Sequence, residues 1–266
     1  MQIFNNSRIF GQTTSGNTMK WEFVEPSKNS FSFAGGDDMI ALANATGKKV
    51  RCHNLVWSEE LPSWVSSGSW TNETLLAVLE HHISKVVRHY GENFFLETIS
   101  ESYIPLVQSL NADIKLFYND YGIENPGARH SAAVKLAKKI QSWPGAHIDG
   151  IGFESHFSTS WPPTKMQQLQ AMSAFTELGL QVQVTELDVA CSAVPCSRSD
   201  LATQAKAYFD TVSACVEMED CTGITVWDLM INIVGFSRVR MMEKGRLVCF
   251  LVIWGGTLRT QLLSRR

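Results

Sequence analysis

The sequence predicts an α/β protein built as a (β/α)8 TIM barrel. Two observations carry this prediction: short runs rich in β-branched and aromatic residues alternate with helical patterns, and a polar cluster follows each run. Strands that alternate with helices form a parallel sheet, because parallel neighbours need a crossover connection. In a barrel, the loops after the strands build the active-site face. A doubly wound open sheet is the alternative, but the sequence lacks the glycine-rich phosphate turn expected after its first strand.

The predicted elements follow one another without an internal repeat or a low-complexity linker, so we expect a single domain. The strand-like runs lie at 49–52, 114–118, 148–153, 182–185 and 223–226. Apolar residues at helical spacing predict helices at 75–90, 131–143, 164–178 and 199–216. Ser199 is the expected N-cap of the last of these helices, and Gly179 is the expected C-terminal cap of the third.

Composition and charge restrict the class of partner. With 44% hydrophobic and 18% charged residues among 266, the chain can bury a sizeable core. A net charge of −3 leaves no basic surplus to neutralise phosphates, which argues against nucleic-acid and acidic-membrane partners. The apolar run at 247–254 is far too short to cross a bilayer. Residues 1–8 lack the charged and apolar regions of a signal peptide, so we expect none in the chain as given.

The six cysteines do not follow a metal-binding pattern. Neither close pair, at 191 and 196 or at 215 and 221, has the two-residue gap of a zinc knuckle. We therefore expect no metal and no cofactor. Cys215 and Cys221 bracket a short polar turn, which is compatible with a disulfide and also with two unpaired buried thiols.

Glu186 is the leading candidate for a catalytic carboxylate. Glu186 and Asp188 alternate along an extended segment, so their side chains share one face. His156, at the end of the preceding strand, could hydrogen-bond either carboxylate and keep it ionised. His53, Trp57 and Trp227 would line a pocket suited to a sugar ring. The alternative is that Glu186 and Asp188 are a solvated loop pair, but the four other polar strand ends weigh against it.

Several longer motifs occur in order along the chain. They are GNTMKW at 16–21, FSF at 31–33, RCHNLVW at 51–57, LPSWV at 61–65, YNDY at 118–121, GFESH at 152–156, TELD at 185–188 and GITVW at 223–227. With these motifs the chain resembles the family 10 glycoside hydrolases, which are retaining endo-1,4-β-xylanases on a β/α barrel. The resemblance extends from about Phe10 to Asp228. We therefore expect a catalytic barrel at 1–228 and an atypical tail at 229–266.

The resemblance implies a role for each matching residue. Glu186 would be the nucleophile, and His156 and Asp188 would orient it and set its charge. The residues implied in substrate binding are Asn17, Lys20, His53 and Trp57 on the non-reducing side, Asn119 near the nucleophile, and Trp227 against the sugar at the cleavage point. Cys215 and Cys221 coincide with a disulfide common in the family. The resemblance further implies xylan as the partner, an extracellular location and a monomer.

The sequence also departs from the family. Retaining hydrolysis needs a second carboxylate as acid/base, and in the family this Glu ends a Trp-Asp-Val-x-Asn-Glu motif on the fourth strand. Here residues 89–92 lead directly into 93–97, and the next stretch resembles the following helix, so we expect the fourth strand and its Glu to be missing. Glu97 and Glu101 are two carboxylates that could replace it, but we expect them on the solvated face of that helix, on the outside of the barrel. The family's first strand would precede Phe10, where only a few residues stand.

Glu154 stands where the family usually has Gln, and it is expected to face the site. It would add a negative charge beside Glu186 and raise the pKa of one of the two carboxyl groups; alternatively, it could substitute as the acid/base. The sequence thus predicts an endo-1,4-β-xylanase that is inactive or impaired. The alternatives are a catalytically silent xylan-binding protein and a defective gene product, in which the gap and the tail come from a misplaced splice junction or another reading frame.

Overall fold

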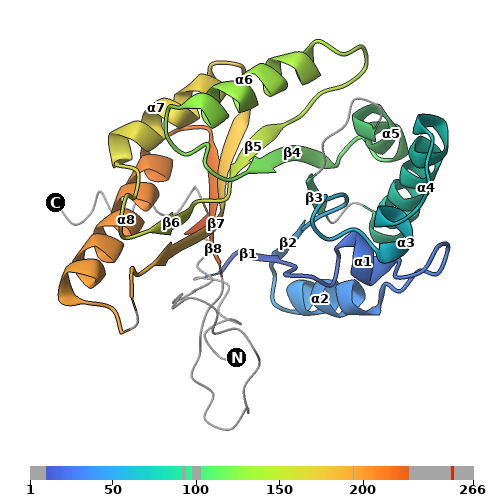
Figure 1. The fold of residues 1–266 in the computed structure, drawn as a ribbon, viewed down its shortest axis with the longest axis horizontal. Coiled ribbons are helices and arrows are strands. Elements are labelled where there is room, and N and C mark those ends of the chain that lie inside the picture. The colour runs from blue at the N-terminus through green and yellow to red at the C-terminus, as the bar shows by residue number, and fades with distance from the viewer. Residues whose placement is uncertain (1–9, 92–93, 98–102, 194, 228–252, 255–266) are drawn as a thin grey trace, which may run out of the picture. The chain divides into compact units, whose positions relative to one another are not determined.

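The computed structural model describes residues 10–91, 94–97, 103–193, 195–227 and 253–254 (Figure 1). The chain divides into two compact units, one formed by Met1–Tyr118 with Ala137–Gly150 and the other by Asn119–Leu136 with Ile151–Arg266. The expected absence of the family's first strand concerns residues before Phe10, which lie outside the described residues, as do Glu101 and nearly all of the tail at 229–266. Among the described residues, no helix is both long enough and apolar enough to cross a membrane.

The first unit is built on parallel strands joined by helices. Its elements, in order, are β1 (Gln12–Thr14), α1 (Trp21–Val24), α2 (Ala34–Ala45), β2 (Lys49–Cys52), α3 (Ser63–Ser66), α4 (Asn72–Tyr90), β3 (Phe94–Glu97), α5 (Tyr103–Leu110) and the beginning of β4 (Lys115–Asp120). Strands β1, β2, β3 and β4 pair in that order, and every pair is parallel. The helix predicted at 75–90 is α4, which begins earlier because the Thr71 side chain accepts from the Thr74 N–H in a capping box.

Strand β3 corrects the prediction that the fourth strand is missing. Phe94–Glu97 pairs with β2 on one side and with β4 on the other, with Leu96 opposite Cys52 and Leu116. Glu97 therefore ends a strand, and the prediction that it lies on a helix is wrong. Strand β3 does not contain the family's fourth-strand motif. Phe94–Glu97 shares only its final Glu with Trp-Asp-Val-x-Asn-Glu.

The second unit follows the same strand-then-helix order. Its elements are the N-terminal part of α6 (Ala128–Gln141), β5 (Gly150–Phe153), β6 (His156–Ser158), α7 (Lys165–Thr176), β7 (Gln181–Ala190), α8 (Arg198–Glu217), β8 (Cys221–Val226) and β9 (Ile253–Trp254). The strand order is β5-β7-β8-β9, with β6 paired to β7. Strands β6 and β8 are parallel to β7, whereas the two described residues of the tail form β9, which is antiparallel to β8.

Strand β7 has the longest buried run among the described strands of the second unit. Its eight central residues, 182–189, are all buried, as expected for a central parallel strand that is covered on both faces.

The helix ends of the second unit follow the predicted capping chemistry with one correction. The N-cap of α8 is Ser197, not Ser199, because the Ser197 hydroxyl accepts the Asp200 N–H at 3.0 Å. Gly179, after α7, has a φ of +77°, the left-handed conformation expected of a terminating glycine.

Two disulfides stabilise the second unit. Cys215–Cys221 ties the end of α8 to the start of β8 with a Cα–Cα distance of 5.2 Å, which confirms the pairing that the resemblance implied. Cys191–Cys196 closes the loop after β7 with a Cα–Cα distance of 5.6 Å. In the first unit, Cys52 is a free, buried thiol.

Candidate active site

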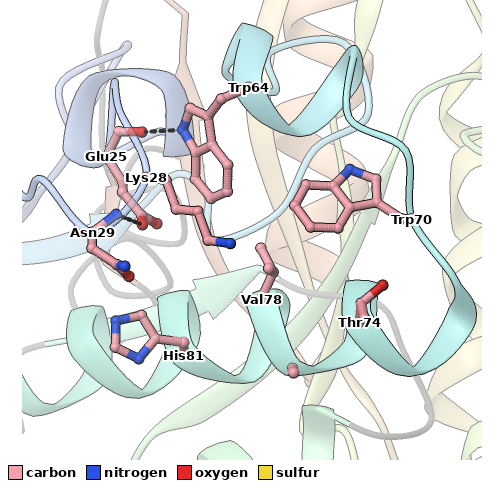
Figure 2. A pocket seen from close by; sticks show the side chains of 9 residues that line it. Glu25, Lys28, Asn29, Trp64, Trp70, Thr74, Val78 and His81 are labelled. Atoms are coloured by element: carbon pink, nitrogen blue, oxygen red, sulfur yellow. Dashed lines mark hydrogen bonds between the residues drawn. The ribbon is translucent and has the colours of Figure 1, made fainter.

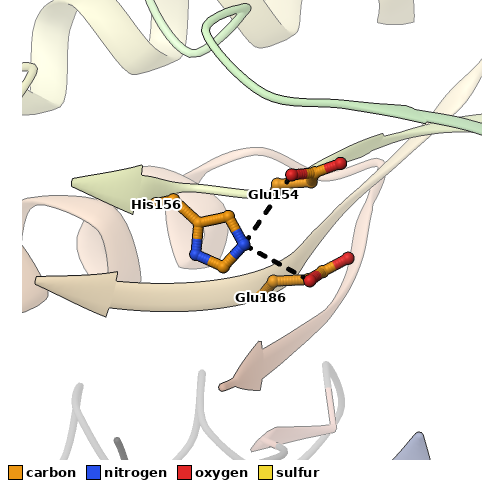
Figure 3. Close-up of side chains that lie close together, drawn as sticks. All are labelled: Glu154, His156 and Glu186. Atoms are coloured by element: carbon orange, nitrogen blue, oxygen red, sulfur yellow. Dashed lines mark ion pairs between the residues drawn. The ribbon is translucent and has the colours of Figure 1, made fainter. Parts of the chain in front are cut away.

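The Glu186 carboxylate lies at the centre of a polar cluster in the second unit. Its side chain is 6% exposed, and a carboxylate so deeply buried requires partners that compensate for lost hydration. His156 Nε2 lies 3.3 Å from Glu186 Oε2, and Asn119 Nδ2 donates to Glu186 Oε1 at 3.2 Å. The predicted contact between His156 and Glu186 is therefore present (Figure 3).

His156 is held on its other side by Asp188, as the sequence predicts. Strand register places His156 opposite Asp188, and His156 Nδ1 lies 2.9 Å from Asp188 Oδ2. Burial alone would lower the pKa of His156, but its hydrogen bonds to Asp188 and Glu186 outweigh burial and raise the pKa to about 10. The imidazole is thus a cation near neutral pH, between two buried carboxylates.

Glu154 brings a third carboxyl group to this cluster. Glu154 Oε2 lies 3.7 Å from His156 Nε2, and Glu154 Oε1 accepts from Asn119 Nδ2 at 3.3 Å. Burial and the nearby charge of Glu186 raise the pKa of Glu154 to about 7. The prediction that one of the two carboxyl groups has a raised pKa is confirmed, and Glu154 is the group concerned.

Asn119 connects β4 to both carboxylates because its amide is fixed by a neighbour. Thr185 Oγ1 donates to Asn119 Oδ1 at 2.6 Å, which leaves the Asn119 NH2 to face Glu154 and Glu186. Gly152 makes room for this amide, since a Cβ at that position would lie 2.1 Å from Asn119 Oδ1. The glycine of the GFESH motif is therefore required by the close approach of a side chain.

Glu124 is a buried residue that binds the backbone next to the cluster, and the sequence analysis did not identify it. It is 4% exposed, and its Oε1 accepts the Ser155 N–H at 2.7 Å. Ser155 has a φ of +62°, a strained conformation for a residue other than glycine, and it separates Glu154 from His156. The Asp188 N–H also bonds to the Ser155 carbonyl at 3.3 Å. Burial raises the pKa of Glu124.

Trp227 closes one side of the cluster. It follows β8 directly, and its backbone N–H bonds to the Leu187 carbonyl at 2.9 Å. Its ring meets the His156 ring edge to face, with centroids 6.4 Å apart. All the sites predicted in the second unit, Asn119, Glu154, His156, Glu186, Asp188 and Trp227, thus belong to one connected group.

The sugar-binding residues predicted in the first unit also gather together. Lys20 Nζ donates to Asn17 Oδ1 at 2.9 Å and lies 4.6 Å from the centre of the Trp57 ring. Its ion pair with Glu60, at 3.0 Å, adds a partner that the sequence analysis did not identify. The His53 and Trp57 rings have centroids 6.4 Å apart. This group combines an aromatic face with charged and amide hydrogen-bonding groups.

A cavity of about 370 Å³ lies elsewhere in the first unit (Figure 2). It is lined by Glu25, Lys28, Asn29, Trp64, Trp70, Thr74, Ala77, Val78 and His81. The indole N–H groups of Trp64 and Trp70 donate to the carbonyls of Glu25 and Val65 at 3.0 and 2.8 Å. Lys28, labelled in Figure 2, places its Nζ 5.5 Å from the centre of the Trp70 ring. None of the predicted sugar-binding residues lines this cavity.

One group among the described residues has a geometry that could hold a metal ion. Glu154, His156 and Glu186 each offer a ligand atom, and these atoms lie within 4.8 Å of one another. These three side chains can lie together without a metal ion, because His156 supplies the positive charge between the two carboxylates. The chemistry that this cluster supports directly is nucleophilic attack by a buried, oriented carboxylate.

Comparisons with known proteins agree with this chemistry. The family model described as "Glycosyl hydrolase family 10" matches residues 2–97 and 97–232. Endo-1,4-beta-xylanase D of Talaromyces funiculosus is 41% identical over 243 residues, which cover 82% of this chain and 59% of that protein. Endo-1,4-beta-xylanase A of Fusarium oxysporum f. sp. lycopersici is 34% identical over 260 residues, covering 86% of this chain and 79% of that protein.

A solved structure gives the same result for the fold. The GH10 xylanase of Bispora sp. MEY-1, crystallised with xylobiose, has a TM-score of 0.81 and 33% sequence identity, and the likeness covers 96% of this chain and 87% of that one. Parallel strands that carry a buried, histidine-supported carboxylate at their carboxyl ends are the arrangement expected of the (β/α)8 barrel class. The chain belongs to glycosyl hydrolase family 10. It spans 59% and 58% of the length of the first two curated relatives.

Proposed function

We propose that this chain is a retaining endo-1,4-β-xylanase with Glu186 as its nucleophile, impaired because it lacks a dedicated proton donor. The observation that carries the proposal is the support of Glu186 by His156 and Asn119, with His156 fixed in turn by Asp188. The names of the relatives, all endo-1,4-beta-xylanases, indicate the substrate class. We take the substrate to be xylan, which the chain would bind as a monomer.

In the first chemical step, a Glu186 oxygen bonds to the anomeric carbon while the bond from that carbon to the leaving oxygen breaks. The electron pair of the broken bond stays on the leaving oxygen, which in xylan must take a proton from solvent water because the proposal gives the chain no dedicated donor. A water oxygen then bonds to the anomeric carbon while the ester bond to Glu186 breaks, which regenerates the carboxylate and releases the remaining water proton to solvent. His156 and Asn119 remain in place through both steps and stabilise the negative charge of the free carboxylate.

Glu154 places a carboxyl oxygen within 4.8 Å of one on Glu186, but its position suits proton donation poorly. A donor and a nucleophile flank the scissile bond from two sides. Here both carboxyl groups contact the same Asn119 Nδ2 and approach the same His156 Nε2, so they lie side by side. A glycosidic oxygen would have to displace these donors to fit between them. This arrangement favours impairment over substitution by Glu154.

An aryl xyloside and xylan, used side by side, separate the proposal from its alternatives. A substrate with a dinitrophenyl leaving group needs no proton, so we expect turnover that Glu186→Gln abolishes and that azide accelerates. Xylan should be hydrolysed roughly 10²–10⁴-fold more slowly than by an intact family member, the usual cost of losing a general acid. Xylan binding without any turnover of the aryl xyloside would establish a silent binding protein instead. A purified chain without cooperative unfolding would indicate a defective gene product.

Glu97→Gln is the matched control for the missing proton donor. The family's acid/base Glu ends a motif on a strand, and Glu97 likewise ends β3. The proposal expects this variant to hydrolyse xylan as slowly as the parent chain. A large loss in Glu97→Gln would reveal a dedicated donor and contradict the impairment.

We also propose that the protein is extracellular. Two disulfides in a chain of this size are typical of an oxidising compartment. Reduction of the protein purified from culture medium should increase its mass by four hydrogen atoms, two for each disulfide, as intact mass spectrometry measures; an unchanged mass would contradict the proposal.

A further inference from the structure

Trp161 is the most exposed large hydrophobic side chain among the described residues. It is 92% exposed, compared with 68% for Phe209 and 49% for Tyr121 in the same unit. Single exposed aliphatic residues are common, but a tryptophan almost wholly in solvent gives up a large amount of apolar burial. Nothing in the catalytic cluster uses this indole, so its exposure needs another explanation.

The loop that carries Trp161 is fixed at both ends. On one side, the Thr159 N–H donates to the Ala190 carbonyl at 2.8 Å, and Thr159 Oγ1 donates to Asp200 at 2.7 Å. On the other side, Thr164 forms a capping box with Gln167 at the start of α7. Pro162 and Pro163 between them have restricted backbone angles. The indole therefore extends from a stiff support, which lowers the entropy lost when it binds a ligand.

The same loop leaves the carboxyl end of β6, the strand that begins with His156. Trp161 comes five residues after His156, so their Cα atoms lie within about 18 Å of each other. Loops at the carboxyl ends of barrel strands build the substrate site. Trp161 is thus close enough to contact a polysaccharide that is bound at Glu186, at a sugar some distance from the cleaved bond.

The composition of the loop distinguishes a sugar from a protein partner. Residues 157–164 read FSTSWPPT, with four hydroxyl side chains and no charge around a single indole. A protein interface needs a contiguous patch of several large side chains. A flat aromatic ring with small hydroxyl groups beside it suits a pyranose, which offers an apolar C–H face and a rim of hydroxyls.

We propose that Trp161 is an outer sugar-binding platform that stacks on a xylose unit remote from the cleaved bond. The proposal rests on the proposed function, because it takes xylan as the bound polymer. It differs from the binding roles implied for the residues around Glu186, since Trp161 would act only on substrates long enough to reach it. Trp161 would therefore set a preference for longer chains.

Binding of xylo-oligosaccharides of two to six sugars tests this, by isothermal titration calorimetry in the Glu186→Gln background, where turnover is blocked. Trp161→Ala should weaken the binding of xylohexaose about tenfold, the usual cost of removing a tryptophan anchor, and should leave xylobiose unchanged. Trp161→Phe should recover part of the loss. Phe209→Ala is the matched control, because Phe209 is also exposed but lies on α8, and it should change neither affinity.

Three results would overturn the platform. Trp161→Ala could leave xylohexaose affinity unchanged, it could weaken xylobiose and xylohexaose equally, or the parent chain could bind no xylo-oligosaccharide. A change in sedimentation coefficient on Trp161→Ala, with unchanged sugar affinity, would show instead that the indole contacts another copy of the chain. Because the readout is binding, a chain that binds as expected but fails to cleave xylan would contradict the proposed activity and leave the platform standing.

Discussion

Replacing Glu154 by Gln should stabilise the folded chain in a strongly pH-dependent way. Burial and the Glu186 charge move the pKa of Glu154 from its ordinary 4.5 to about 7, so the folded state favours the protonated carboxyl. The stability that this group contributes is complete below pH 4.5 and is lost as the pH rises through about 7. The side chain is only 21% exposed, so solvent screens little of this effect.

A pKa change of this size corresponds to about 3 kcal/mol, at roughly 1.4 kcal/mol per pH unit. Gln has the shape of the protonated carboxyl and cannot ionise, so Glu154→Gln escapes this loss. The stability that Glu154→Gln gains over the parent chain, measured as the difference between their free energies of unfolding, should therefore be about 3 kcal/mol larger at pH 8 than at pH 4. Urea unfolding at both pH values, followed by tryptophan fluorescence, measures this difference.

Glu177→Gln is the control for a general effect of removing a carboxylate, since Glu177 is exposed at the end of α7. We expect no comparable pH-dependent gain from it. An equal stability change for Glu154→Gln at pH 4 and pH 8 would refute the reasoning, because it would mean that Glu154 ionises in the folded chain as easily as in the unfolded one.

Three further predictions follow from the same contacts. Gly152→Ala should reduce turnover of the dinitrophenyl xyloside at least about tenfold and destabilise the fold by about 1–3 kcal/mol, because the new methyl group collides with Asn119; full activity would contradict this. Glu124→Ala should lower kcat with little change in KM and lower the His156 pKa measured by NMR, whereas Glu124→Gln, which keeps an acceptor for Ser155, should recover most of kcat; equal effects of both variants would contradict a positioning role. Opening the Cys215–Cys221 disulfide by a double Ser substitution should cost about 2 kcal/mol, the value for a loop of this short length, as measured by urea unfolding; an unchanged midpoint would oppose it.

The sequence was sufficient for the part of the site that local pattern encodes. Alternation along 185–188 places Glu186 and Asp188 on one face, the polar end of the preceding strand indicated His156, and the motif resemblance added Asn119. Glu124 was missed because its role depends on the left-handed backbone of Ser155. A serine in a sequence does not indicate this conformation.

The fold could be predicted from the sequence where strand and helix patterns are long. It could not be predicted where pairing with neighbouring strands determines whether a short segment becomes a strand. Residues 94–97, Phe-Phe-Leu-Glu, are too few to show a period, so the resemblance to a helix governed the interpretation. In the structure these residues form β3 because β2 and β4 offer free edges on both sides. Tertiary context also decides the start of α8, where Ser197 and Ser199 are both chemically able to cap and only Ser197 has the required backbone geometry.

The assignment of Glu186 as the nucleophile is tested most directly by trapping the covalent intermediate. A 2-deoxy-2-fluoro-xylobioside with a dinitrophenyl leaving group should form a stable ester, because the fluorine slows both chemical steps and the good leaving group restores the rate of only the first, in which the ester forms. Peptide mass spectrometry should then find one added sugar on the peptide that contains Glu186, and no adduct in Glu186→Gln. An adduct on Glu154, or an adduct that persists in Glu186→Gln, would contradict the assignment.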